Sequence, residues 1–349
     1  MRDVAIVSFA QFTAPEDRRS ESELLLPVLD EAVATVGLTR QEIGFTCSGS
    51  TDYLAGQPFS FVAALDAVGA WPPIAESHVE MDGAWALYEA WLWLASGDAD
   101  TALVYAFGKP SPSDLSRTLA LQLEPYTVGP LFPDSHALAV LQARALLDAG
   151  ATTEDELAAI AARAHQAGTR NPHATRAGDR TADDVLADAA TYAPLRDLMT
   201  PPVTDGCAAV VLAAGDRARE LTDTPVWIRG MDHRIEAPAL GVRDLTDSPS
   251  TRIAAQAAGL DGHGVDLAEL HTRYAHEEVI LTRALGMNGD TAITPSGGAL
   301  VADPFMATGL IRIGEAATRL KNGDGQRALA HATSGACLQQ NLVTILEVE

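Results

Sequence analysis

The segment ESHVEMDGAWAL, residues 76–87, joins a strand-like run to a helix-like run at Gly83. Many α/β enzymes hold a nucleophile at such a junction. No Ser, Cys or Lys follows the strand here, and Glu80 stands at the junction instead. A carboxylate at this place can transfer a proton or pair with a neighbouring group. A structural role for Glu80 at a dimer interface is the alternative interpretation.

A second group of polar residues lies in the last third of the chain. His271 ends the apolar run 265–271, where α/β sheets place ligands, and imidazole titrates near neutral pH. Tyr274 follows, and it either relays a proton or only fills a pocket with its hydroxyl bonded to backbone. Asp303 precedes a helical pattern and is either a base, a group that orients His271, or a helix N-cap. His276 is expected on the solvated surface of a helix.

Three glycines are candidates for binding through the backbone. Gly297, Gly298 and Gly335 lie in turn-like segments, and a glycine lets a ligand approach the main-chain N–H groups closely. These N–H groups are predicted to act as donors to a ligand oxygen.

The composition excludes several classes of function. The formal net charge is −23, with 47 acidic and 24 basic residues, and this field repels nucleic acid. Only Lys109 and Lys321 are available for Schiff-base chemistry. The three cysteines are far apart and form no CxxC pair, so we expect neither a disulfide nor a metal site, with Cys47 and Cys207 as small core residues. No signal peptide or membrane-spanning run is recognised, which predicts a cytoplasmic protein.

Strand and helix patterns alternate on both sides of a more polar middle region. The alternation predicts a mostly parallel sheet with helices on both faces, and its recurrence suggests a duplicated α/β unit. The predicted strands are 4–10, 43–50, 77–81, 101–108, 205–214, 225–231, 265–271, 328–335 and 341–348. The predicted helices are 22–37, 60–69, 83–97, 274–286 and 305–320, and the helix at 83–97 is apolar nearly all round and should be buried.

The region 109–200 interrupts this alternation with polar runs and acidic helical stretches. It is predicted to be an excursion from the sheet that shapes the substrate site, because loops carried by a sheet often do so. The expected division is 1–108 with 201–220 as one half, 109–200 as the insertion, and 221–349 as the second half.

Several segments resemble the thiolase superfamily in order and spacing. The segments that resemble sterol-carrier-type thiolases are VDLAELHTRYAHEEVILTRALG (265–286), PSGGALVADPFMATG (295–309), TDGCAAVVLA (204–213) and HVEMDGAWAL (78–87). The segments CSGSTDYLAGQPFSF (47–61) and ESHVEMDGAWALYEA (76–90) look like actinobacterial lipid-transfer proteins, thiolase-like proteins of sterol side-chain breakdown. The resemblance implies an α/β thiolase fold in which two similar βαβαβ-type halves form a five-layered α/β/α/β/α core, with an inserted loop region.

The same resemblance implies that the thiolase catalytic groups are changed. Glu80 falls where the nucleophilic cysteine belongs, Asp303 on the histidine of the GHP motif, and Thr333 on the second cysteine. Cys337 is not expected to replace that second cysteine. His271 matches the His of a His-Asp-x-Phe segment, in which Tyr274 replaces the Phe. Thiolysis through an acyl-cysteine is therefore not expected.

Retro-aldol cleavage of a β-hydroxyacyl-CoA needs no such nucleophile, only a base, donors for the thioester enolate and an acid. Some lipid-transfer-like branches are retro-aldolases of steroidal acyl-CoA esters. The resemblance thus implies a steroidal acyl-CoA substrate with CoA as its thioester moiety, a small OB-fold/zinc-ribbon subunit, and a thiolase-like dimer partner, either a second copy or a paralogue. The alternative is a non-catalytic subunit that pairs with an active paralogue, and a lipid carrier without chemistry is a weaker third hypothesis.

Overall fold

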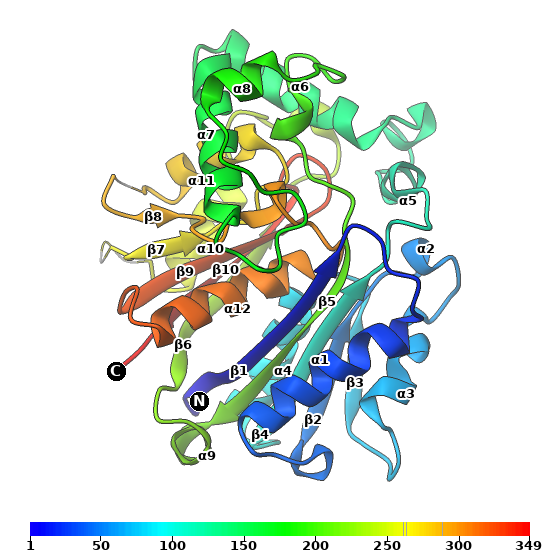
Figure 1. Cartoon of the computed structure of the whole chain (residues 1–349), viewed down its shortest axis with the longest axis vertical. Helices are drawn as coiled ribbons and strands as arrows, with labels where there is room; N and C mark the ends of the chain where they lie inside the picture. The colour runs from blue at the N-terminus through cyan, green and yellow to red at the C-terminus, as the bar shows by residue number, and fades with distance from the viewer. Residues whose placement is uncertain (261, 263, 288) are drawn as a thin grey trace.

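The computed structural model describes residues 1–260, 262, 264–287 and 289–349. Within these residues, ten strands form one hydrogen-bonded sheet in the order β3-β2-β4-β5-β1-β6-β10-β9-β7-β8 (Figure 1). The strands of the first half are β1 (Val4–Ala14), β2 (Phe45–Gly49), β3 (Glu76–Val79), β4 (Thr101–Gly108) and β5 (Asp205–Ala214). Those of the second half are β6 (Val226–Ile235), β7 (Leu267–Glu269), β8 (Ala292–Ile293), β9 (Arg327–Ser334) and β10 (Gln340–Glu347).

The two halves repeat one topology. Read outward from the centre of the sheet, the first half runs β1-β5-β4-β2-β3 and the second runs β6-β10-β9-β7-β8. The pairing senses match as well, and the halves join where Ala5 of β1 lies opposite Trp227 of β6. The predicted pair of similar α/β halves is confirmed.

The prediction of a mostly parallel sheet was wrong. Parallel pairing is confined to β3-β2-β4 and β8-β7-β9, and the pairs that connect these two groups are antiparallel. The sequence misled because β5 is buried along its whole length. A continuous apolar run is typical of parallel strands covered on both faces, but an antiparallel strand between two helical layers has the same composition.

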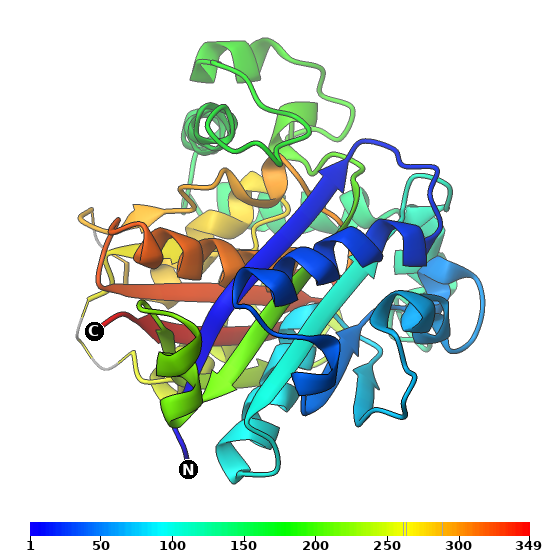
Figure 2. The same ribbon diagram turned by 60° about the horizontal axis from the view of Figure 1, so that its bottom comes forward.

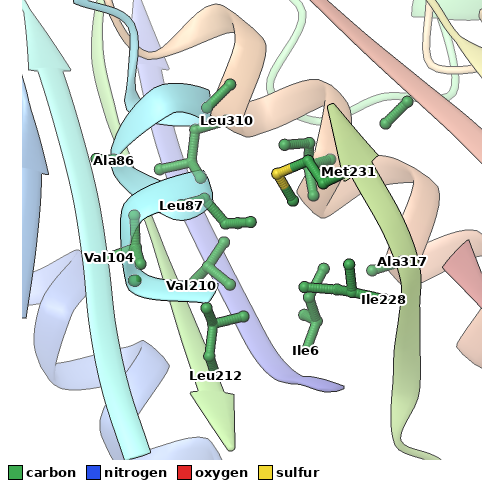
Figure 3. Close-up of a cluster of buried hydrophobic side chains, with 14 of the residues drawn as sticks. Ile6, Ala86, Leu87, Val104, Val210, Leu212, Ile228, Met231, Leu310 and Ala317 are labelled. Carbon is green, nitrogen blue, oxygen red and sulfur yellow. The ribbon is translucent and has the colours of Figure 1, made fainter. Parts of the chain in front are cut away.

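Two buried helices form the central layer. The helix α4 (Gly83–Ser96) and the helix α12 (Thr308–Lys321) contribute to one hydrophobic cluster with strands of both halves. Figure 3 shows Leu87 of α4 and Leu310 of α12 in this cluster, with Val210 and Ile228 from the strands of the two halves. The glycine at the start of α4 permits the contact, because a Cβ on Gly83 would lie 3.1 Å from the Cβ of Leu310.

Further helices cover the outer faces of the sheet. On the first half these are α1 (Glu21–Thr35) and α3 (Leu65–Val68), whereas α10 (Pro249–Ala257) and α11 (Ala275–Ala284) cover the second half. The five-layered α/β/α/β/α arrangement is therefore confirmed. The segment predicted as one helix at 60–69 is a 3₁₀ turn at Ser60–Ala64 followed by α3, and α10 was not predicted because its apolar face is short and interrupted by polar residues.

The insertion at 109–200 folds into helices, of which the first lies against residues 51–54 of the first half and the others pack on the second half. Its helices are α5 (Leu115–Leu121), α6 (Ser135–Asp148), α7 (Glu154–Gly168) and α8 (Ala182–Ala187), while α2 (Asp52–Ala55) and α9 (Gly215–Leu221) are short helices outside it. Helices α6, α7 and α8 share a hydrophobic cluster with Tyr274, Ala275 and Leu300, and Figure 2 shows the green segment beyond the strand ends. In the described part of the chain, no helix combines the length and apolar character needed to cross a membrane.

Candidate active site

A pocket of about 930 Å³ lies where the second half meets the insertion. Its floor comes from the residues after β7, the loop before α12 and the turn after β9, and its wall comes from α5 and α6. The lining residues include Asp82, Leu119, Leu123, Leu138, His271, Arg273, Tyr274, Glu277, Asp303, Phe305, Thr333, Gly335 and Cys337. A pocket with an apolar wall and a few polar groups is typical of small-molecule sites.

His271 follows β7 and is buried in the pocket floor. The backbone N–H of Thr333 donates to its Nδ1 at 3.3 Å, so Nδ1 is the acceptor and the proton of the neutral ring is on Nε2. Burial, followed by the Arg273 cation, lowers the pKa of His271 well below its ordinary value, which keeps the ring neutral. Its Nε2 makes no hydrogen bond within the described residues and lies 3.9 Å from Asp303 Oδ1.

Asp303 is the central acceptor of the site. Its Oδ2 accepts from Arg273 Nε at 2.8 Å and its Oδ1 accepts from Thr308 Oγ1 at 2.8 Å. Asp303 is buried and lies in the loop five residues before Thr308, the first residue of α12. The side chain bonds to a hydroxyl of that helix and not to its backbone N–H groups, so the structure does not show the N-cap that was the alternative interpretation.

Tyr274 lies at the start of α11 with its ring among aromatic neighbours. His136 of α6 meets the ring edge to face at 5.6 Å, and His276 stacks with it at 5.8 Å between centroids. Its hydroxyl is buried, and the side chain of Ser135 in α6 is near enough to hydrogen-bond to it. Burial raises the pKa of Tyr274 to about 12, and Arg273 opposes this effect. The phenol is therefore protonated at neutral pH and suited to donate a proton.

The carboxylate of Asp82 joins the starts of both central helices. Its Oδ1 accepts the N–H of Ala84 in α4 at 2.8 Å and that of Leu310 in α12 at 3.1 Å, and its Oδ2 accepts the N–H of Gly309 at 2.8 Å. Burial raises the pKa of Asp82 to about 7, although these three donors oppose the effect. Asp82 thus fixes both halves of the chain to each other at the pocket.

The sequence did not single out Asp82, Arg273 or Glu277, which all line the pocket. Asp82 carried a signal, since an acidic residue directly before an apolar helix is typical of an N-cap. Glu277 accepts the backbone N–H groups of Arg273 at 2.7 Å and Tyr274 at 3.2 Å, and burial raises the pKa of Glu277 to about 7. Its sequence context carried no such signal, because a Glu pair on a helix usually faces water.

The structure brings Tyr274, His271, Asp303 and Gly335 together in this pocket but not the other predicted site residues. Glu80 is exposed outside the pocket lining, and its Oε1 accepts from Thr51 Oγ1 at 2.6 Å and from the N–H of Asp52 at 2.8 Å. Gly297 and Gly298 are also outside the lining. The position of a Cβ on Gly297 would be 2.8 Å from Ala164 O of α7, so this glycine permits close packing of the insertion.

The prediction that His276 is solvated was wrong. His276 is fully buried, its Nε2 lies 3.2 Å from Gln142 Oε1 of α6, and burial lowers its pKa to about 3. The insertion covers the helix face that would otherwise meet water. Cys47 and Cys207 are buried in strands, as predicted.

Cys337 lines the pocket, but its surroundings do not activate the thiol. Burial raises the pKa of Cys337 to about 12, and its Sγ lies 3.5 Å from the carbonyl oxygen of Leu138. A protonated thiol is a weak nucleophile.

Comparisons with known proteins identify similar sequences. No protein-family model matches the chain. It is 28% identical over 360 residues to the acetyl-CoA acetyltransferase of Methanocaldococcus jannaschii, covering 92% of this chain and 90% of that protein. It is also 28% identical over 293 residues to the acetyl-CoA acetyltransferase of Methanothermobacter thermautotrophicus, covering 75% and 76%. Sterol carrier protein 2 of Gallus gallus is 28% identical over 219 residues, or 55% of this chain and 40% of that protein.

Solved structures share the fold over nearly the whole chain. The Ltp2–ChsH2(DUF35) aldolase superposes with a TM-score of 0.82 at 19% identity and covers 99% of this chain and 97% of its own. The acetyl-CoA acetyltransferase of Bacillus anthracis superposes with a TM-score of 0.81 at 15% identity and covers 100% and 99%. In fold and in sequence, the chain is therefore similar to proteins of the thiolase superfamily, including acetyl-CoA acetyltransferases and sterol carrier protein 2.

Proposed function

We propose that the protein is a carbon–carbon lyase that cleaves a β-hydroxyacyl-CoA to a ketone and a shorter acyl-CoA by a retro-aldol reaction. The observation that carries the proposal is the cluster of His271, Tyr274 and Asp303 in one pocket, where the buried and unpartnered Nε2 of His271 and the buried phenol of Tyr274 lie beside a buried carboxylate. Buried polar groups without partners are rare in folded proteins, and a ligand that completes their hydrogen bonds accounts for them.

Each group has a role in this reaction. Asp303 accepts the proton of the β-hydroxyl group, the β-oxygen forms a carbonyl, and the Cα–Cβ bond breaks. Its electron pair forms the thioester enolate, and the Nε2–H of His271 donates a hydrogen bond to the enolate oxygen. Tyr274 donates its proton to Cα and takes the proton that Asp303 holds in exchange. The protons balance, and no covalent intermediate is required.

The absence of an activated nucleophile supports cleavage over thiolysis. The protonated Cys337 is the cysteine that lines the pocket among the described residues, and Thr333, which the resemblance aligns with the second thiolase cysteine, has no thiol. The convergence of the three candidate residues likewise supports a catalytic chain over a non-catalytic subunit. An occluded pocket or diverging side chains would have supported the latter.

A steroidal acyl group is the proposed substrate class. The apolar wall of α5 and α6, with Leu119, Leu123 and Leu138, suits a bulky hydrocarbon. A small OB-fold/zinc-ribbon subunit is the proposed partner, because the similar aldolase is a complex of Ltp2 with ChsH2(DUF35). A thiolase-like dimer partner, a second copy or a paralogue, completes the proposed assembly.

Turnover of a β-hydroxy steroidal acyl-CoA tests the proposal. The chain is co-expressed with a DUF35-type subunit, and release of ketone and short acyl-CoA is measured for wild type and for Tyr274→Phe. Loss of the proton donor should reduce the rate by about 10²-fold or more. Tyr105→Phe is the matched control, because Tyr105 is also a buried tyrosine with a serine side chain, that of Ser48, beside its hydroxyl, but it lies outside the pocket lining. A folded complex without turnover, or equal losses in both variants, would refute the proposal.

A further inference from the structure

Arg273 lines the pocket but has no role in the proposed reaction as described above. Among the described residues that line the pocket, it is the single Arg or Lys, and the neighbouring His271 is neutral. Three acidic residues, Asp82, Glu277 and Asp303, line the same pocket. Among the described lining residues, Arg273 is therefore the one cationic group that a bound ligand can contact.

The guanidinium group is fixed from several sides but keeps free donors. Its Nε donates to Asp303 Oδ2 at 2.8 Å, and its Cζ lies 5.7 Å from the ring centroid of Phe305 and 6.0 Å from that of Tyr274. The terminal nitrogens Nη1 and Nη2 make no hydrogen bond within the described residues and keep some solvent contact. The side chain is 16% exposed and lines the pocket, so these donors are accessible to a ligand bound there.

The charges of the pocket indicate which acceptor suits these donors. A carboxylate on the ligand would add negative charge to a lining that already has three acidic residues. A hydroxyl or ketone oxygen accepts hydrogen bonds from a guanidinium without adding charge. In the proposed reaction, Asp303 must reach the β-hydroxyl group in order to take its proton. Because Arg273 is paired with Asp303, the substrate oxygen nearest to Arg273 is the one on the β-carbon.

We infer that Arg273 contacts the substrate and binds the oxygen on the β-carbon of the acyl chain, so that the pocket selects β-oxygenated thioesters over unsubstituted ones. The inference rests on the proposed function, because Asp303 positions the β-carbon. When Asp303 takes the hydroxyl proton, the terminal N–H groups of Arg273 stabilise the negative charge that develops on the β-oxygen.

A pair of ligands that differ in one oxygen tests this selectivity. 3-Hydroxy-3-methylbutyryl-CoA and 3-methylbutyryl-CoA have the same carbon chain, and their dissociation constants are measured by calorimetry on the full-length chain, alone and with the co-expressed small subunit. Hydrogen bonds from a charged donor should give the hydroxylated thioester about 10- to 150-fold tighter binding. Equal dissociation constants in the wild type would overturn the inference.

Two substitutions assign the selectivity to Arg273. Arg273→Met removes every donor and should abolish the preference, but it leaves Asp303 without its cation and can weaken the fold. Arg273→Lys keeps a cation for Asp303, so thermal denaturation should match the wild type, but its single ammonium group does not replace the planar fork of donors. The preference should therefore fall by about 10-fold or more in Arg273→Lys, and a lysine variant with the full preference would contradict the inference.

The binding and cleavage measurements distinguish failure of the Arg273 inference from failure of the proposed reaction. A preference that depends on Arg273, without release of acetone and acetyl-CoA, would refute the retro-aldol reaction and retain the inference. Release of these products, together with a substitution of Arg273 that changes neither the binding preference nor kcat/KM, would retain the retro-aldol reaction and refute the inference. Absence of binding by both thioesters would overturn the assignment of Arg273 as a substrate contact.

Discussion

Replacing Asp82 should separate its role as a helix cap from the cost of burying its charge. Asp82→Ala removes the acceptor of three buried N–H groups, those of Ala84, Gly309 and Leu310. A buried donor without a partner costs about 1–3 kcal/mol, and the three losses are not additive because they share one site. We expect Asp82→Ala to lower the free energy of unfolding by about 3–5 kcal/mol at pH 8.

Asp82→Asn keeps one acceptor oxygen but cannot ionise, so its comparison with wild type isolates the charge. Burial raises the pKa of Asp82 from its ordinary value of 3.8 to about 7. The protonated form is thus favoured in the folded state, and its stabilising contribution is fully present below pH 4 and lost as the pH rises through 7. The free energy of unfolding of wild type minus that of Asp82→Asn should fall by about 4 kcal/mol over this interval.

Urea denaturation of wild type, Asp82→Asn and Asp82→Ala at several pH values between 4 and 8 measures these differences. Other titrating groups contribute equally to the proteins compared and cancel in the difference. A difference between wild type and Asp82→Asn that increases with pH would refute the reasoning, because it would mean that the helix N–H donors hold Asp82 ionised against burial.

Other substitutions test the remaining features. Gly108→Ala would place a Cβ 1.7 Å from Phe305 O, so it should displace the loop that carries Asp303 and reduce turnover by about 10-fold or more, with the loss measured against thermal stability. Glu80→Gln should leave kcat unchanged within about 2-fold, since Glu80 lies outside the pocket lining. Arg312→Met removes the donor 2.8 Å from the buried Glu269, which keeps Arg319 at 3.5 Å and the hydroxyl of Ser296, and should cost about 1.5–3 kcal/mol in urea denaturation. Burial raises the pKa values of Asp82 and Glu277 in the pocket lining to about 7, so a step in the pH profile of kcat/KM near 7 should remain unchanged in His271→Asn; because His271 is neutral there, a step near 6.5 that disappears in this variant would contradict the reasoning.

Local pattern was sufficient for the duplicated α/β units and for part of the site. The strands 101–108 and 205–214 end where β4 and β5 end, because uninterrupted apolar runs are bounded by polar and glycine residues. His271, at the end of an apolar run, lies in the pocket for the reason the sequence suggested, since loops after parallel strands gather at one edge of a sheet. The pairing sense of the central strands was not recoverable, because burial on both faces hides it.

The amino-acid sequence by itself determined the alternating elements, the net negative charge and the absence of a Ser, Cys or Lys at the 76–87 junction, because these depend on residue type and local spacing. Tertiary structure alone decided which polar residues share the pocket. The insertion covers His276. Glu80 lies outside the pocket lining, where it accepts hydrogen bonds from Thr51 and Asp52. The ion pair of Arg273 with Asp303 joins residues thirty positions apart. Burial and charge at a site depend on neighbours brought together by folding, and periodicity along the chain carries no record of those neighbours.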